Sequence, residues 1–228
     1  DLIISGNELE FGRILVTQSG QLIVDVLIEG NNIARHSLNT EFGLQCRNAS
    51  RAVIDGNFVH ECQGGGIAVE GGEFSCIGNR SDGNGLGGNV TAGMREAYYF
   101  ACTSGFVGYG RVQSNTARTH PGYAYYFLSP QNVDFVDNFS LGHTLGFLNV
   151  VSPTLLGTLP FLQVDFVSDI SDFNPEGSVY ASPGSIIRRR VLSGVAKAPI
   201  LMKKFTVGDP FGPNGWVAMD APGAAFVV

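Results

Sequence analysis

A four-residue phrase recurs six times along the first two-thirds of the chain. It consists of an apolar residue, one variable residue, a small or turn-forming residue, and asparagine, and its copies end at Asn7, Asn31, Asn57, Asn79, Asn115 and Asn138. Subtracting successive Asn numbers gives spacings of 24, 26, 22, 36 and 23 residues. A period of this length indicates that one supersecondary unit is stacked repeatedly, with one enlarged copy.

Each unit alternates short β-type runs with Gly or Asn turns, as in Gly43 to Cys46 and Gly66 to Val69, and shows no helical periodicity. A unit of about two dozen residues with three short strands is one coil of a parallel β-helix. We therefore expect an all-β fold with about six coils over residues 1–152.

The stacked asparagines have a physical cause in this fold. Consecutive coils lie about 4.8 Å apart, so residues at one repeat position form a ladder along the axis. Asn tolerates left-handed backbone geometry, and its amide can bond the backbone and the Asn of the next coil. Asn79 and Asn138 also begin Asn-x-Ser/Thr sequons. Their ladder positions leave no room for a glycan, so we interpret these sequons as coincidental.

Composition limits the possible partners. The net charge of −6 and the pI near 5.1 argue against nucleic acid, since the chain has no basic stripe outside Arg188, Arg189 and Arg190. No apolar run is long enough for a transmembrane helix, which predicts no membrane insertion, and the N-terminus lacks a signal peptide. Asp1 falls within a repeat, so we expect the chain to begin inside a larger parent or just after a processing point.

The four cysteines are expected to be free, buried thiols. Counting from Gly43 places Cys46 and Cys102 in the same column two coils apart, with Val69 between them. That separation of about 9.6 Å exceeds the reach of a disulfide.

After residue 152 the repeat stops, and Gly- and Pro-punctuated β-type runs follow. Their expected bounds are Leu162 to Val167, Ser178 to Tyr180, Ile186 to Leu192, Ile200 to Val207 and Trp216 to Met219. We expect residues 153–228 to cap the solenoid and to bury themselves against other subunits.

The segments Pro175 to Arg189, Ile200 to Phe205 and Gly215 to Ala218 resemble the C-terminal segment of bacteriophage tail-spike and tail-fibre proteins. In those proteins the segment follows a right-handed, pectate-lyase-like parallel β-helix. The resemblance implies a homotrimer on a virion, outside the cell, in contact with other virion proteins. It implies no particular chemistry, and the Pro- and Gly-rich stretch from Phe205 to Pro213 departs from the pattern.

Three functions follow as hypotheses. The first is attachment to a bacterial surface polysaccharide, the second is a polysaccharide depolymerase acting as a lyase or hydrolase on capsule or O-antigen, and the third is a capsid- or tail-decorating protein without a ligand. For binding, period-two alternation directs Tyr98, Phe100 and Tyr123 inward and leaves Tyr99 and Tyr126 outside. Exposed tyrosines can stack on a sugar ring or pack against another subunit.

Hydrolysis needs two carboxylates facing a groove. Glu70, Glu73, Asp82 and Glu96 flank the enlarged repeat, with Glu70 and Glu96 as catalytic candidates, and Arg95 and Asp82 are candidates for contacting the sugar. A solvated acidic rim explains the same carboxylates, so the question of catalysis stays open at this point.

Two further patterns are interpreted as structural. Gly83 to Gly88 satisfies GxGxxG without a βαβ unit, which favours a turn in the enlarged repeat. His36, Cys62, His120 and His143 share a repeat position without a carboxylate, which favours a turn ladder. We expect no metal and no cofactor.

Overall fold

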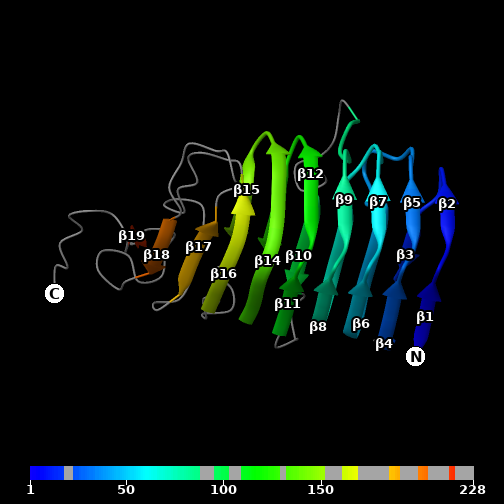
Figure 1. Cartoon of the computed structure of the whole chain (residues 1–228). Helices are drawn as coiled ribbons and strands as arrows, with labels where there is room; N and C mark the ends of the chain where they lie inside the picture. Colours follow the sequence, from blue (N-terminus) through cyan, green and yellow to red (C-terminus); the bar gives the residue numbers. More distant parts are fainter. Residues whose placement is uncertain are drawn as a thin grey trace.

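Short apolar runs between turn residues form strands that stack in parallel from coil to coil (Figure 1). The chain is a right-handed parallel β-helix of about five turns in this computed structural model. The described residues are 1–17, 23–87, 95–102, 109–128, 132–151, 161–168, 185–190, 200–204 and 216–218. Within these ranges there is no helix, and thus none that could cross a membrane. The predicted fold is confirmed. The six asparagines mark the ends of five successive turns, whereas about six coils were expected.

Three stacks of strands surround the core. The first stack contains β3 (Ile14–Val16), the front halves of β6 (Leu44–Asp55) and β8 (Ile67–Ile77), β10 (Tyr98–Cys102), β13 (Tyr123–Leu128) and β15 (Gly146–Val151). The second contains β1 (Leu2–Ser5), β4 (Ile23–Glu29), the back halves of β6 and β8, β11 (Tyr109–Gln113), and the front halves of β14 (Asn132–His143) and β16 (Phe161–Ser168). The third contains β2 (Glu8–Glu10), β5 (Asn32–Ala34), β7 (Phe58–His60), β9 (Arg80–Asp82), β12 (Thr116–His120) and the back halves of β14 and β16.

Beyond the repeats the parallel pairing continues from β14 to β16 and from β16 to β17 (Ile186–Arg190). β18 (Ile200–Lys204) and β19 (Trp216–Ala218) then pair antiparallel. Four of the five expected C-terminal strands are thus present, and Ser178 to Tyr180 lies outside the described residues. The division of the chain at residue 152 stays a prediction.

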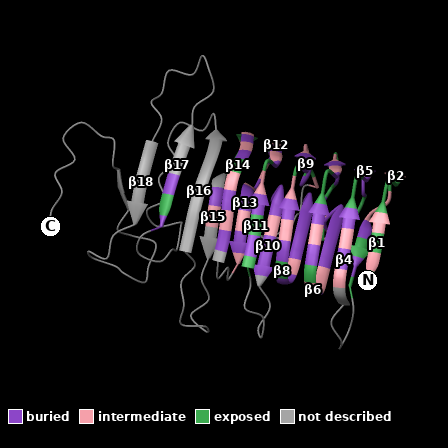
Figure 2. Ribbon diagram, turned by 60° about the horizontal axis from the view of Figure 1, so that its bottom comes forward, coloured by how far each residue is buried: buried purple, intermediate pink, exposed green. Residues whose placement is uncertain are grey.

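The core is a set of ladders formed by the inward side chains. The apolar residue of the repeated phrase contributes one ladder, in which Ile28, Ile54, Cys76 and Val112 are all 0% exposed. A second ladder is aromatic: Tyr98 stacks on Tyr125, and Phe100 on Phe127, each at 4.9 Å between ring centroids. The inward positions of Tyr98 and Phe100 are therefore confirmed, and the buried residues follow the inside of the stacked strands (Figure 2).

The six asparagines form one continuous hydrogen-bonded ladder at the corner between the second and third stacks. At each step the backbone N–H and the side-chain Nδ2 of one Asn donate to Oδ1 of the next, as in the 3.0 and 2.9 Å bonds from Asn31 to Asn57. The preceding residue is left-handed in every copy, with φ between 55° at Asp137 and 64° at Gly6. The phrase is thus a turn, with the left-handed residue third and the ladder residue fourth.

A second left-handed corner, between the third and first stacks, has no such sequence signature. Its positions include Phe11 (φ 62°), Arg35 (57°), Glu61 (55°) and Thr119 (53°). Non-glycine residues are uncommon in this region of backbone space, so the surrounding structure must hold them there. Hydrogen bonds between coils do so, as in Arg35 N–H to the His60 carbonyl at 3.1 Å.

Two expectations about register were wrong. Cys46 pairs through Val69 with Phe100, whereas Cys102 pairs with Gly71, two residues further along the strand. Likewise Tyr98 pairs with Tyr125, so Tyr123 lies outside the inward column that it was assigned to and is partly exposed. The cause is local: Ala97 and Ala124 occupy the column of Gly43 and Gly66, and Gly122 lies two residues before that column.

Candidate functional site

The first stack carries two outward tyrosines on neighbouring coils. Tyr99 and Tyr126 are register partners, and their rings stack with 5.5 Å between centroids and 12° between planes. Both side chains are partly exposed, in agreement with the expectation from alternation. The two-residue slip in register left this expectation intact, because side-chain direction depends only on whether a shift is odd or even. We call Tyr99 and Tyr126 the tyrosine platform.

Two other rings contact the platform, Phe42 from another coil and Tyr123 from the same strand as Tyr126. The Phe42 ring lies 5.7 Å from Tyr99, although one whole coil separates their strands, and Tyr123 lies 6.3 Å from Tyr126. Phe42 reaches this position by crossing Gly65, where a Cβ atom would lie only 2.2 Å from the Phe42 ring. A glycine at this position therefore permits the aromatic contact. Phe42 is only 1% exposed and serves to support the platform.

A fixed ion pair stands beside the platform. Glu70 Oε1 accepts hydrogen bonds from Arg47 Nε at 2.9 Å and from Gln45 Nε2 at 2.8 Å. Arg47 and Glu70 are register partners in β6 and β8, and Gln45 is 2% exposed. The buried amide of Gln45 holds the carboxylate in place, while the Arg47 side chain remains 40% exposed.

Glu96 lies two residues before β10, the strand that carries Tyr99, and is buried, at 3% exposed. Its Oε2 accepts the backbone N–H of Arg95 at 2.9 Å. Burial raises the pKa of Glu96, and the Arg95 charge opposes that shift. Glu96 is therefore a structural neighbour of the platform, held by backbone.

The electrostatics bring these groups together around the tyrosine hydroxyls. The pKa of Tyr99 is raised to about 12, first by burial and then by the charges of Glu70 and Glu96, whereas Arg47 lowers it. Burial and Glu96 also raise the pKa of Tyr126. Both tyrosines consequently remain protonated at neutral pH and can donate hydrogen bonds.

The two catalytic candidates do not occupy adjacent positions. Glu70 pairs with Ala101, which follows Glu96 by five residues, and only Glu70 is on the outer face. Asp82 lies in the third stack, on β9, where its carboxylate accepts a 2.7 Å hydrogen bond from Arg80. The structure brings together Glu70, Glu96, Arg95, Tyr99 and Tyr126, and it separates Asp82 from them.

The histidine positions form the turn ladder that was expected, but the expectation of no carboxylate was wrong at His36, whose Nε2 lies 3.3 Å from Glu41 Oε2. The rings of His120 and His143 stack at 5.5 Å, and His143 Nε2 lies 3.2 Å from the Ala117 carbonyl. Asn84 occupies the same ladder position and accepts the Cys62 N–H at 2.8 Å, a role that the GxGxxG pattern concealed. In the described part of the chain no group of three or more His, Cys, Asp or Glu side chains is placed to hold a metal ion.

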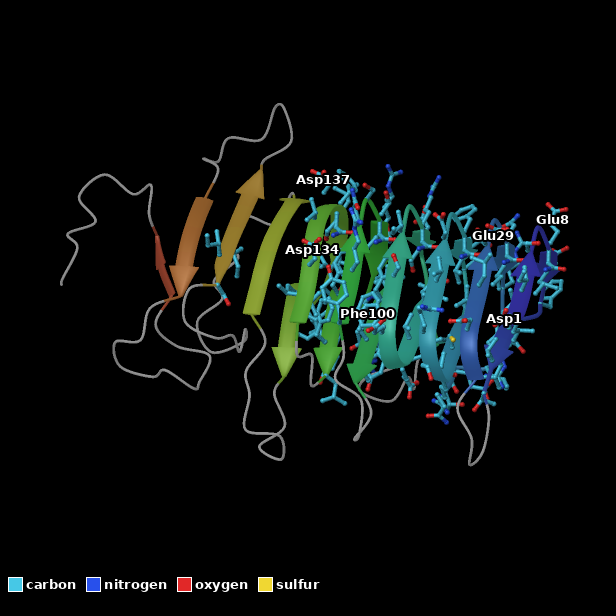
Figure 3. The ribbon with its side chains drawn as sticks, turned by 90° about the horizontal axis from the view of Figure 1, so that it is seen from below. Asp1, Glu8, Glu29, Phe100, Asp134 and Asp137 are labelled. Carbon is cyan, nitrogen blue, oxygen red and sulfur yellow. The ribbon has the colours of Figure 1, made fainter. Side chains whose placement is uncertain are left out.

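Cys46, Cys62 and Cys76 are free and buried, as predicted. A hollow of about 450 Å³ lies elsewhere, on the third stack near the N-terminal end; it is lined by Glu8, Leu9, Glu10, Asn32, Ala34, Arg35 and His60. Figure 3 shows how the side chains run along the solenoid, from Asp1 and Glu8 at one end, past Phe100, to Asp134 and Asp137. None of the candidate residues lines that hollow.

Sequence reasoning missed Gln45, Arg47 and Phe42. The signal for the first two was available, because aligning Cys46 with Val69 places Arg47 opposite Glu70. The Phe42 contact was not visible, since it depends on a ring crossing a neighbouring coil.

No protein-family model matches the chain, and neither a curated protein nor a solved structure matches it. The likeness to phage tail-spike proteins therefore rests on the residues that suggested it. What the fold and the site define is a parallel β-helix with an aromatic and polar platform on one lateral face.

Proposed function

We propose that this chain attaches to a bacterial surface polysaccharide through the tyrosine platform, as part of a homotrimeric phage virion protein of the tail-spike or tail-fibre type. The observation that carries the binding proposal is the stacked, partly exposed pair of Tyr99 and Tyr126. Aromatic faces bind the apolar faces of sugar rings, while tyrosine hydroxyls donate hydrogen bonds to sugar oxygens.

The spacing of the platform suits a repeating ligand. Tyr99 and Tyr126 lie on neighbouring coils with 5.5 Å between their ring centroids, so an extended polymer along this face can contact the exposed edges of both rings. The virion and trimer parts of the proposal are supported by the resemblance of the C-terminal segment alone. Binding without cleavage is proposed, because Glu96 is buried and Glu70 is held by Gln45 and Arg47.

The test is retention of the protein on a panel of immobilised bacterial polysaccharides. The double variant Tyr99→Ala/Tyr126→Ala should lose at least tenfold in affinity, as expected for removal of two stacking rings. Tyr109→Ala is the matched control, because Tyr109 is 51% exposed but lies on β11 in the second stack. Equal retention of the double variant and the control would contradict the proposal, and light scattering that reports a monomer would contradict the trimer.

A further inference from the structure

Arg47 and Glu70 form a rigid donor and acceptor pair at the edge of the tyrosine platform. We propose that this pair reads two neighbouring hydroxyl groups of a neutral sugar that lies across the exposed edges of Tyr99 and Tyr126. The inference rests on the proposed polysaccharide binding and names the class of sugar that the same face selects.

The ion pair is held in place and still has atoms that can form hydrogen bonds with a ligand. Both hydrogen bonds to Glu70 end on Oε1, and Arg47 uses only Nε in its bond. No hydrogen bond within the described part of the chain uses Glu70 Oε2 or the two terminal nitrogens of Arg47. Because Gln45 is buried and anchors Oε1, the free oxygen keeps its place without a ligand. A preorganised group of this kind loses little entropy on binding.

The pair lies within reach of a sugar on the platform. The register partner of Tyr99 in β8 is Ala68, so Glu70 lies two positions further along that strand, and Arg47 is the register partner of Glu70. The register partner of Glu70 in the next coil is Ala101, so only a methyl group follows Glu70 in that column beside Tyr99. A sugar that lies against the exposed edge of Tyr99 can therefore direct two of its hydroxyl groups at the pair.

The chemistry of the pair matches a vicinal diol. One sugar hydroxyl can accept from a terminal nitrogen of Arg47, while its neighbour donates to Glu70 Oε2. An ammonium group on the ligand would pair with Glu70 but be repelled by Arg47. A carboxylate would pair with Arg47 but be repelled by Glu70.

The charge balance favours a neutral sugar. Arg47 is paired with Glu70, so this ion pair has a formal charge of zero. An acidic sugar that approaches Arg47 would also meet the Glu70 carboxylate, which repels it. Neutral polysaccharides should bind more tightly than uronate-containing ones.

The experiment uses a panel of purified bacterial polysaccharides divided into neutral and uronate-containing members, with binding measured by biolayer interferometry. The best neutral binder is then measured again after periodate oxidation and borohydride reduction, which cleave and cap its vicinal diols. Arg47→Ala and Glu70→Gln are compared with Arg51→Ala. That control removes an arginine which is also paired with a carboxylate, Asp25, but lies in the second stack. Glu70→Gln keeps an acceptor for the buried amide of Gln45, which protects the fold.

The expected result is preference for neutral members, loss of binding after oxidation, and a loss of about tenfold or more in Arg47→Ala and Glu70→Gln, as for a hydrogen bond to a charged group. Arg51→Ala should bind like the unmodified protein. Tyrosine-dependent binding that prefers uronate-containing members, or that is unchanged in Arg47→Ala and Glu70→Gln, would overturn this inference and leave the proposed function standing. Absence of binding to every member would overturn both.

Discussion

Replacement of Asn57 by alanine should destabilise the protein severely, although it removes no apolar contact. The Asn57 side chain accepts bonds from the backbone N–H and Nδ2 of Asn31, and donates to the Ile28 carbonyl at 2.9 Å, the Asp55 carbonyl at 3.1 Å and Asn79 Oδ1 at 2.9 Å. Its two amide hydrogens supply about two full bonds among three acceptors. Loss of four bonds at about 1 kcal/mol each lowers the free energy of unfolding by about 4 kcal/mol. The buried Asn31 N–H, left without an acceptor, lowers it by about 1 kcal/mol more.

Asn7 provides the matched control at the end of the same ladder. Its side chain is exposed and donates only to the Ser5 carbonyl at 3.1 Å and to Asn31 Oδ1 at 2.8 Å. Asn7→Ala should therefore lower the free energy of unfolding by about 1 kcal/mol or less. The contrast between the two variants isolates the ladder from the general effect of losing an asparagine.

Urea unfolding followed by far-UV circular dichroism measures the two free energies, and amide hydrogen exchange locates the damage. In Asn57→Ala the Asn31 amide loses its acceptor and should exchange faster. The Asn79 amide bonds Asn115 Oδ1 at 3.0 Å and should be much less affected under native conditions. Equal free energies of unfolding for the two alanine variants, with an unchanged Asn31 exchange rate, would refute the ladder as the source of stability.

Three further predictions concern buried polar groups. Burial, and then the charge of His143, lowers the pKa of His120 from 6.5 to about 3. Between those pH values the unfolded chain binds a proton that the folded chain does not, so the free energy of unfolding should fall as the pH decreases, by roughly 5 kcal/mol in all. In a pH series of urea titrations His120→Asn should reduce this fall, and an unchanged slope would contradict the assignment. Tyr98→Phe should cost about 1–2 kcal/mol in the same unfolding assay, because the hydroxyl bonds the carbonyls of Asn79 and Thr116 at 2.8 and 3.0 Å; a neutral effect would argue against both bonds. Burial raises the pKa of the Cys76 thiol, so iodoacetamide should label it only after unfolding, and labelling of the native protein detected by mass spectrometry would be inconsistent with its burial.

The repeat in the sequence was sufficient to predict the parallel β-helix. Stacking forces equivalent residues into ladders, so a period read from six asparagines carries information about long-range contacts that a single strand never does. The same logic predicted the outward direction of Tyr99 and Tyr126, because alternation along a strand depends on parity and tolerates a slip of two residues.

The sequence did not predict the register between coils where the glycine before the first strand is replaced by another residue. Ala97 and Ala124 stand in the column that Gly43 and Gly66 mark in earlier coils, so Cys102 and Tyr123 lie outside the columns expected for them. The second left-handed corner, at Arg35 and Glu61, could not be predicted from residue type either. Hydrogen bonds from the neighbouring coil hold the backbone in that conformation.

By itself, then, the sequence determined the stacking unit, the asparagine ladder and the inward or outward direction of most side chains, because each follows from local periodicity. Only the tertiary structure decided which outward side chains meet. The contact of Phe42 with Tyr99 and the pairing of Arg47 with Glu70 join residues on different coils, and they form once the register between those coils is set. The platform and its neighbouring ion pair are consequences of that register, which depends on the packing of the whole solenoid.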